Sequence, residues 1–372
     1  MSTNPQAVPP WEQLFPPPAE ATRSVTLQMR LLRKHGEPLL LLPATGRTTH
    51  AALSLYPAQS WKAKVARGGL RLTGMVGWLP GTTPVALRID PQAAFAKFLA
   101  PPGLSAQALS FALLLGNPHA AGRRYVLLVC DAAGQPIRVV KAGEGNGRAV
   151  ELIQSEAAFR QAAPATLLSA PALHGRFHDG EVAALSMDYA AGTTPRCDEF
   201  EPAARLLESW IDRSRTVPFA ALAVAQRLEA NARTDEVTRR ALTAMRRLEF
   251  HPTIHHGDFA PWNIRVDATG RWQVLDWERG ELAGPPAWDW FHYLIQPEVL
   301  VRRTQPAEIL AKVQRFLHSE HFTRYTAQAG IASCVAELLL GYLIYCRDVT
   351  RQTEGMPVVE ALVAGCPLPP PA

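Results

Sequence analysis

The amino-acid sequence predicts an α+β protein in which a small antiparallel sheet lobe precedes a larger helical lobe. Short β-like runs separated by Gly, Asn and Pro turns occupy the first half of the chain, and helical spacing of apolar residues dominates after residue 199. Hydrophobic residues make up 47% of the 372 residues and charged residues 19%, which supports sizeable cores and two or three domains.

Both ends of the chain are rich in proline, and we expect extended tails over residues 1–24 and 361–372. After the first tail, the sequence predicts an extra N-terminal β-rich module over residues 25–103. Its predicted strands are residues 25–32, 38–42, 51–56 and 70–78. The segment Pro101-Pro102-Gly103 follows the last strand and predicts a domain boundary.

The next predicted lobe, residues 104–192, is a small sheet with one helix. Three apolar runs joined by short turns predict an antiparallel meander; they are residues 108–115, 125–130 and 137–140. Helical spacing of apolar residues then predicts a helix over residues 147–163. A further apolar run, residues 182–187, leads into the segment that ends at Gly192.

Residues 193–360 form the predicted helical lobe. Its expected helices are residues 201–213, 219–232, 234–249, 308–316 and 331–347. Two strand-like pieces, residues 264–266 and 272–275, interrupt the helices with an irregular segment that is rich in polar side chains.

Composition excludes several classes of protein. The net charge of +5 is spread along the chain without a basic block, so no nucleic-acid partner is expected. The five cysteines form no Cys-x-x-Cys pair, which argues against a structural zinc site or a disulfide framework and favours a reducing compartment. The most apolar stretch, residues 335–346, contains Glu337 and is too short to cross a membrane. We therefore expect a cytoplasmic globular protein without a membrane partner; its oligomeric state stays open.

Polar residues concentrate in the segment from His255 to Asn263 and again at Asp276. Asp258 follows Gly257, which lets the backbone turn tightly, and Asp276 stands just past a short apolar strand. A carboxylate at the end of a buried strand needs a cation or a hydrogen-bond network. Carboxylate and amide oxygens suit Mg²⁺, which usually binds through few carboxylates and the phosphates of a substrate. The pattern therefore predicts a functional site in which these oxygen atoms bind a cation such as Mg²⁺.

These residues resemble the catalytic core of the aminoglycoside phosphotransferase family, a relative of choline kinases and, more distantly, of protein kinases. The motifs are His256-Gly257-Asp258 through Asn263 and Asp276-Trp277-Glu278, within about residues 104–350. The resemblance implies a bilobal protein-kinase-like fold with ATP and Mg²⁺ as cofactors. It makes Asp258 the catalytic base and Asn263 and Asp276 the metal ligands. Asp289, in Gly-Pro-Pro-Ala-Trp-Asp, would brace the catalytic loop.

Phosphoryl transfer also requires a cationic clamp on the phosphates of the nucleotide. The chain has only six lysines, and Lys141 is the only one between Lys97 and Lys312. It ends the third strand of the meander, so we expect it to bind nucleotide with Glu156 of the following helix as its partner. Glu151 is the less favoured alternative partner.

The resemblance places adenine recognition in the linker between the lobes, at Met187, Asp188, Tyr189 and Ala190. Contacts there would be mostly through the backbone, and Met187 could equally belong to the core. The turn between Gly116 and Gly122 is at the position of a phosphate-covering loop, although a simple hairpin turn would have the same sequence.

Several neighbouring residues have alternative interpretations. His255 and His256 could suggest zinc, yet no further ligands stand at suitable spacing, so His256 is expected to brace the loop. Trp277, Trp288 and Trp290 could stack on a substrate but are expected in the core. The role of Glu278 stays open.

The predicted function is ATP- and Mg²⁺-dependent transfer of the γ-phosphoryl group to a hydroxyl of a small polar molecule. A sugar, an amino-sugar or an aminoglycoside-like compound would each be possible as the acceptor. One alternative is a catalytically weak nucleotide-binding regulator, which the intact set of site residues argues against. A protein kinase is disfavoured by Asp-Trp-Glu at residues 276–278 and by the 12 residues between Asp276 and Asp289, too few for an activation segment.

Overall fold

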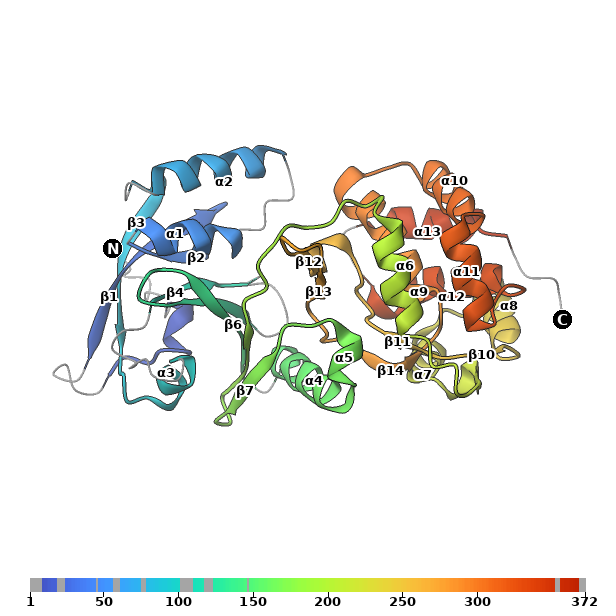
Figure 1. Cartoon of the computed structure of the whole chain (residues 1–372), viewed down its shortest axis with the longest axis horizontal. Helices are drawn as coiled ribbons and strands as arrows, with labels where there is room; N and C mark the ends of the chain where they lie inside the picture. The colour runs from blue at the N-terminus through green and yellow to red at the C-terminus, as the bar shows by residue number, and fades with distance from the viewer. Residues whose placement is uncertain are drawn as a thin grey trace, which may run out of the picture. The chain divides into compact units, whose positions relative to one another are not determined.

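The computed structural model describes residues 9–18, 24–44, 46–55, 61–74, 78–100, 110–116, 123–145, 147–351 and 355–367. The chain divides into two compact units (Figure 1). The first unit comprises Met1–Ala157 and Pro171–Tyr189, and the second comprises Ala158–Ala170 and Ala190–Ala372. The first is built on a sheet and the second is mainly helical, which confirms the α+β class predicted from the sequence.

The first unit contains an eight-stranded sheet of order β3-β1-β2-β4-β5-β6-β8-β7, in which all neighbouring strands are antiparallel. The strands are β1 (Val25–Lys34), β2 (Glu37–Pro43), β3 (Thr82–Ile89), β4 (Ser110–Leu114), β5 (Arg124–Cys130), β6 (Pro136–Glu144), β7 (Leu173–His178) and β8 (Val182–Asp188). The meander predicted from residues 108–140 is therefore confirmed as β4, β5 and β6.

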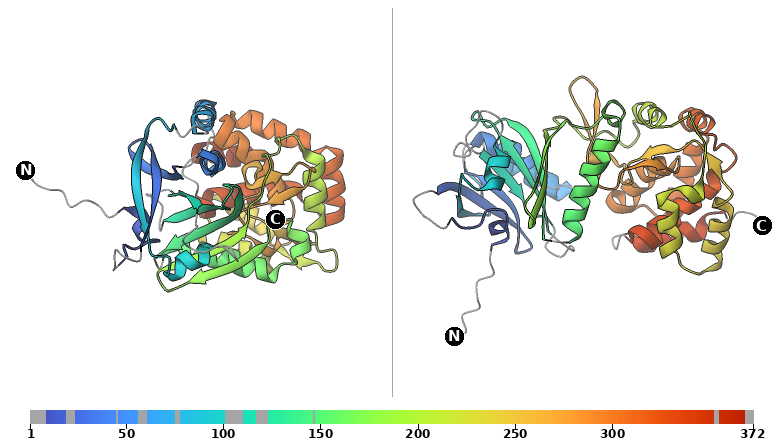
Figure 2. Two further views of the ribbon diagram at one scale, coloured as in Figure 1. Left: turned by 60° about the vertical axis from the view of Figure 1, so that its left-hand side comes forward. Right: turned by 90° about the horizontal axis from the view of Figure 1, so that it is seen from below.

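Helices pack on both faces of this sheet, because alternate side chains of its strands point to opposite sides. The helices are α1 (Gly46–Ala52), α2 (Trp61–Gly74), α3 (Ala94–Leu99) and α4 (Arg148–Ala162). One face packs on α1 through Leu40, Leu42, Ala52 and Ala112. The other face packs on α3 through Leu41, Phe95, Leu99, Phe111 and Leu113. Helix α4 packs on β8 through Val150, Ile153, Ala157, Ala183 and Leu185 (Figure 2).

Two of the predicted N-terminal strands are wrong. Residues 51–55 complete α1 and form the 3-10 turn Leu53–Leu55, and residues 70–74 end α2. The buried side chains Thr49, Ala52 and Leu53 are spaced by three and four residues, so one side of a helix faces the sheet. Residues 56 and 75–77 of those predicted strands lie outside the described residues.

The N-terminal segment also differs from its predicted organisation. Strand β2 pairs with β4 (Leu40 opposite Leu114), so the strands before residue 103 extend the same sheet instead of forming a separate module. Within the predicted tail, Leu14 and Phe15 are buried in the core beneath the sheet. The Tyr125 hydroxyl donates to the carbonyl of Pro10 at 2.7 Å, which fixes this segment further.

Among the described residues, the second unit contains most of the helices and three two-stranded sheets. Its helices are α5 (Ala165–Leu168), α6 (Phe200–Ser209), α7 (Ala223–Asn231), α8 (Glu236–Met245), α9 (Trp288–Gln296), α10 (Pro306–Leu317), α11 (Glu320–Ala329), α12 (Val335–Tyr345) and α13 (Met356–Gly365). Its strands are β9 (Val217–Pro218), β10 (Glu249–Phe250), β11 (Thr253–His255), β12 (Ile264–Val266), β13 (Trp272–Val274) and β14 (Glu281–Gly284). Helix α13 extends to residue 365, so the C-terminal tail predicted from residue 361 starts too early.

Helix α9 has the sequence Trp-Asp-Trp-Phe-His-Tyr-Leu-Ile-Gln, in which Asp289, His292 and Gln296 lie on one side and the others are aromatic or aliphatic. All of its residues except Leu294 are buried. Trp277, Trp288 and Trp290 are at most 1% exposed, which confirms that these three rings belong to the core. A helix with so many large apolar side chains is expected to be buried among other helices.

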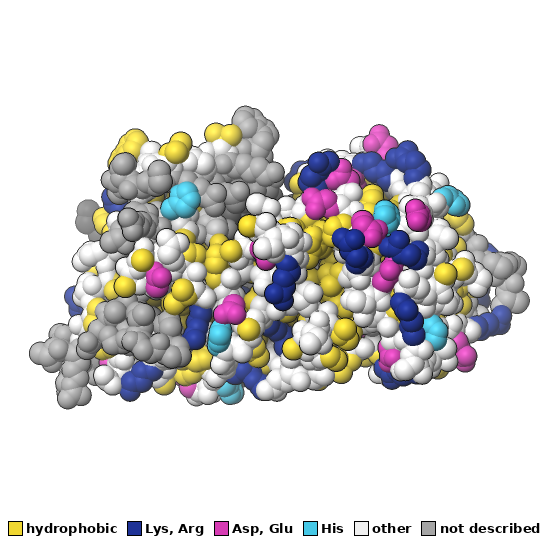
Figure 3. All heavy atoms as spheres, in the orientation of Figure 1, with side chains coloured by type: hydrophobic (Ala, Val, Ile, Leu, Met, Phe, Trp, Pro, Cys, Tyr) yellow, Lys and Arg dark blue, Asp and Glu magenta, His cyan; other side chains and the backbone are white. Residues whose placement is uncertain are grey.

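No helix in the described part of the chain is long and apolar enough to span a bilayer. On the face of the molecule drawn in Figure 3, basic and acidic side chains of the second unit lie next to one another instead of being grouped by sign.

Candidate active site

A hairpin and a tight turn in the second unit bring the predicted site residues together. Strand β11 ends at His255, and Gly257 then adopts a left-handed backbone conformation with φ of 76°. The 3-10 turn Pro261–Asn263 leads into the β12–β13 hairpin, in which Ile264 is opposite Val274. The N–H of Leu275 donates to the carbonyl of Asn263 at 2.7 Å. Asn263 and Asp276 therefore lie at the same end of this hairpin.

The carboxylate of Asp258 is held by one partner on each oxygen. His292 Nε2 lies 2.8 Å from Oδ1, and Asn263 Nδ2 donates to Oδ2 at 2.9 Å. The side chain is 25% exposed, so it still reaches solvent. Burial raises the pKa of this carboxyl, but the hydrogen bond and charge of His292 lower it more. The net pKa lies below the ordinary value, so Asp258 is ionised at neutral pH.

His292 is a site residue that the sequence analysis missed. It lies on α9, and its Nδ1 is 3.2 Å from the hydroxyl of Tyr342 on α12. Because the carboxylate of Asp258 can only accept, Nε2 carries a proton and donates it to Oδ1. One signal was present in the sequence: His292 follows Asp289 by three residues, so both side chains lie on one side of the helix.

Asp289 joins α9 to the turn that carries Asp258. Its Oδ2 accepts from the N–H of His256 at 2.7 Å, and its Oδ1 accepts from the N–H of Gly257 at 3.1 Å. His255 Nδ1 lies 3.3 Å from Oδ1. Burial raises the pKa of Asp289, but these neighbours lower it more, so the net shift is downward. A buried carboxylate thus fixes the backbone just before Asp258.

His256 braces the same turn from within the protein. The N–H of Asp258 donates to Nδ1 at 3.2 Å, so the proton of the neutral ring is on Nε2, which donates to the carbonyl of Leu275 at 2.8 Å. Burial lowers the pKa of this imidazole, which keeps the ring neutral. Its ring also packs on Trp277, with centroids 4.6 Å apart. Both nitrogens have partners within the protein, as expected for a residue that braces the loop.

Asn263 and Asp276 carry side-chain oxygen atoms of the kind that a hard cation prefers. The amide nitrogen of Asn263 bonds both the carbonyl and the Oδ2 of Asp258, which directs its oxygen away from that residue. Asp276 has a left-handed conformation with φ of 68°, which is unusual for a residue other than glycine. Strained conformations of this kind occur at functional sites. Among the described residues no group of three or more His, Cys, Asp or Glu could hold a metal ion, so a cation here would need the amide of Asn263.

In the first unit, Lys141 of β6 donates to Oε2 of Glu156 on α4 at 2.6 Å. The lysine side chain is 16% exposed and the glutamate 1%, so the carboxylate is buried beneath the ammonium group. Glu151, the alternative partner, lies on the exposed side of α4 and pairs with Arg148 instead. This pairing fixes the position of the ammonium group at the surface of β6.

The predicted adenine segment lies at the end of β8. Met187 is buried against α4, where Val150 and Ile153 also pack, so its side chain belongs to the core. The N–H groups of Asp188 and Tyr189 both donate to backbone carbonyls, at 2.9 and 3.1 Å. A base bound here would have to use other backbone atoms of the segment, including those of Ala190.

Of the predicted phosphate-covering turn, the structure describes only the first residue, Gly116. Gly116 has φ of 64°, and a Cβ added to it would lie 2.1 Å from the carbonyl oxygen of Arg124. The glycine is therefore required by the close approach of β5. Residues 117–122 lie outside the described residues.

Comparison with known proteins shows which family the sequence matches. The model of the phosphotransferase enzyme family (APH) matches residues 80–327. No curated protein matches the chain. Among solved structures, it is similar to an aminoglycoside phosphotransferase from Streptomyces rimosus, with 15% identity over 64% of this chain and 91% of that chain and a TM-score of 0.42.

Two further structures are similar to the chain. A choline kinase from Cryptosporidium parvum is 10% identical over 73% of this chain and 92% of that chain, with a TM-score of 0.44. A putative fructosamine-3-kinase from Haemophilus somnus is 11% identical over 68% of this chain and 92% of that chain, with a TM-score of 0.39.

Proposed function

Because the chain belongs to the phosphotransferase enzyme family, we propose that it transfers the γ-phosphoryl group of ATP, in the presence of Mg²⁺, to a hydroxyl of a small polar molecule. The observation that carries this proposal is the carboxylate of Asp258, which is ionised, partly exposed and fixed on both oxygens. Such a group can orient an acceptor hydroxyl and receive its proton as the phosphorus–oxygen bond forms.

The residues around Asp258 contribute by orientation. Asn263 and His292 hold the carboxylate, while Asp289 and His256 fix the backbone that carries it. Because a misplacement of about 1 Å can cost about 100-fold in rate, this rigidity is part of the catalytic design.

The ammonium group of Lys141, held by Glu156, would contact phosphate oxygens, and Asn263 and Asp276 would hold Mg²⁺. When bound, Mg²⁺ neutralises negative charge on the phosphates. The buried carboxylate of Glu156 keeps the lysine in one position, which an unpaired surface lysine would not do.

The experiment is the replacement Asp258→Asn, which removes the proton acceptor and leaves a side chain of the same size. Purified wild-type protein is assayed for Mg²⁺-dependent transfer from ATP labelled in its γ-phosphoryl group, to water and to a panel of sugars, amino-sugars and amino alcohols. We expect Asp258→Asn to lose about 100-fold or more of this activity while its affinity for ATP, measured by calorimetry, stays close to that of the wild type.

Arg239→Gln provides the matched control, because this exposed residue of α8 pairs only with its neighbour Glu236 among the described residues. It should transfer phosphoryl groups at the wild-type rate. An Asp258→Asn variant with unchanged activity would overturn the assignment of Asp258 and, with it, the proposed function.

A further inference from the structure

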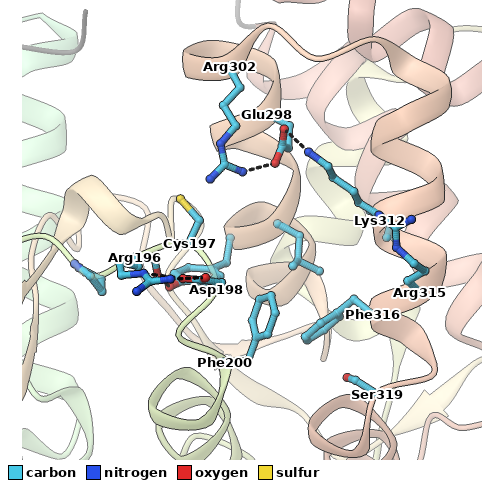
Figure 4. Close-up of a pocket in the computed structure, with 14 residues that line it drawn as sticks. Arg196, Cys197, Asp198, Phe200, Glu298, Arg302, Lys312, Arg315, Phe316 and Ser319 are labelled. Atoms are coloured by element: carbon cyan, nitrogen blue, oxygen red, sulfur yellow. Dashed lines mark hydrogen bonds and ion pairs between the residues drawn. The ribbon is translucent and has the colours of Figure 1, made fainter. Parts of the chain in front are cut away.

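A pocket of about 690 Å³ opens in the second unit beside α9 and α10 (Figure 4). Its lining comes from the segment before α6, from α9 and the π-helix Pro297–Arg302 that continues it, and from α10. The volume is that of a site for a small organic molecule. Six of its lining residues are charged: Arg196, Asp198, Glu298, Arg302, Lys312 and Arg315.

Arg302 and Lys312 of this pocket are exposed to solvent, whereas Glu298, the carboxylate that pairs with both, is buried. Glu298 accepts from Arg302 and, at 3.0 Å, from Lys312. Its side chain is 5% exposed, whereas those of Arg302 and Lys312 are 50% and 42% exposed. Thr304 donates to the same carboxylate, so three of its roughly four lone-pair sites are used within the protein. A ligand that enters the pocket therefore meets the two cations and not the anion.

The remaining charges also leave a positive excess. Arg196 and Asp198 form an exposed pair with two parallel hydrogen bonds of 3.0 and 2.7 Å, so their charges offset each other. Arg315 makes no ion pair with any residue that the structure describes. The four cations and two carboxylates of the described lining thus leave a net charge of +2. An amino-sugar would face like charges here, and an oxyanion would face opposite ones.

Helix α9 connects this pocket to Asp258. His292 contacts the carboxylate of Asp258, and the next residue, Tyr293, lines the pocket. The ring of Tyr293 packs on Phe259, which follows Asp258, with centroids 5.6 Å apart. Its hydroxyl donates to the carbonyl of Arg196, another lining residue, at 3.0 Å. Tyr293 therefore contacts both the pocket and the turn that carries Asp258.

We propose that this pocket binds the carboxylate or phosphate group of an anionic acceptor, whose hydroxyl is the one phosphorylated at Asp258. The inference rests on the proposed function and narrows its substrate class from small polar molecules to hydroxyl compounds that carry an oxyanion. Arg302, Lys312 and Arg315 bind the oxyanion, and Glu298 keeps the first two of these side chains in place.

The experiment compares four compounds with the same ring: glucosamine, glucose, glucuronate and glucose 6-phosphate. Their binding to the full chain is measured by calorimetry without nucleotide, so that it does not depend on turnover. We expect an anionic member to bind at least ten times more tightly than glucosamine, and its affinity to fall as salt is raised. Glucuronate and glucose 6-phosphate distinguish a carboxylate from a phosphate as the preferred group.

Arg315→Gln is the decisive variant, because the side chain is exposed and its loss leaves no buried charge. It should weaken binding of the preferred anion about tenfold or more, as expected for a charge-assisted hydrogen bond. It should also raise the KM for that acceptor while kcat changes little. Arg239→Gln removes the same charge on α8 and should leave both the affinity for the anion and the KM for the acceptor unchanged.

The outcomes separate this inference from the proposed function. If glucosamine binds as tightly as the anions, or Arg315→Gln does not weaken anion binding, the inference is overturned even where phosphoryl transfer is observed. The same conclusion follows if neither these anions nor inorganic phosphate binds. If anions bind as expected but the wild type transfers no phosphoryl group, the proposed function fails and the pocket remains an oxyanion site.

Discussion

The imidazole of His292 holds one oxygen of the Asp258 carboxylate, with Nε2 and Oδ1 2.8 Å apart. The two residues are 34 positions apart in the sequence, and the contact exists because α9 passes directly behind the turn that carries Asp258. His292 is buried and in turn contacts the hydroxyl of Tyr342. Burial keeps the pKa of Tyr342 well above its ordinary value, so that hydroxyl stays protonated. The orientation of Asp258 therefore depends on two helices of the second unit.

We predict that His292→Leu lowers kcat by about 10-fold to 100-fold, because the carboxylate of Asp258 loses its fixed orientation. The KM for ATP should change little, since His292 is not expected to touch the nucleotide. His292→Gln retains an N–H donor and should recover part of the loss. Steady-state kinetics of the two variants checks this. If both variants lose stability and activity equally, His292 serves packing only.

The pair Lys141–Glu156 allows stability and function to be separated. Lys141→Met leaves the buried carboxylate of Glu156 without its lysine and should lower the free energy of unfolding by about 3 kcal/mol. The double variant Lys141→Met/Glu156→Leu replaces the ion pair by apolar side chains and should regain most of that stability. Both variants should bind ATP more weakly than the wild type. Urea unfolding and calorimetry measure the two effects. Normal ATP affinity in the double variant would exclude Lys141 from nucleotide binding.

The sequence predicted the parts of the fold that local patterns determine. The strands β4, β5 and β6 follow from apolar runs between turn residues, and the helix that carries Glu156 follows from its spacing. Helix α9 was missed although Asp289, His292 and Gln296 recur at helical spacing, because a run of nine residues is too short to show a clear period. The last two residues of α1 and the 3-10 turn Leu53–Leu55 were interpreted as a strand, because this short apolar run contains too few turns to show a period.

In the site too, residues that are close in the sequence were predicted, and residues that come from distant helices were not. Gly257, Asp258 and Asn263 are close in the sequence, so their arrangement could be inferred from the motif. His292 and Tyr342 come from other helices, and their contact depends on how α9 and α12 pack. The cations of the pocket beside α10 were not predicted for a similar reason, because the segments that line this pocket are far apart in the sequence. Glu298 is buried while its partners Arg302 and Lys312 are exposed, and composition does not show which side chains are buried.

Gly257 is predicted to be irreplaceable for two reasons that can be measured separately. Its φ of 76° is costly for any residue with a Cβ, and an added Cβ would lie 2.9 Å from the Cβ of Arg279. Gly270 has φ of 81° with no atom within 4 Å of an added Cβ, so Gly270→Ala tests the conformational cost alone. That variant should lose about 1 to 2 kcal/mol of unfolding free energy. Gly257→Ala should lose more and should also lower kcat. Equal losses in stability with unchanged kcat would contradict this account.

Asp289 is predicted to make the protein sensitive to acid. Its pKa in the folded chain lies below the ordinary value because of its hydrogen bonds to the turn before Asp258 and its contact with His255, which outweigh burial. Its contribution to stability is therefore complete above the pKa of the unfolded chain, about 3.9, and is lost as the pH falls toward the lower folded value. Asp289→Asn should reduce the unfolding free energy at neutral pH by about 1 to 3 kcal/mol. It should also flatten the decline below about pH 4. Urea unfolding of both proteins between acid and neutral pH measures the two slopes, and parallel slopes would show that Asp289 does not titrate as its surroundings indicate.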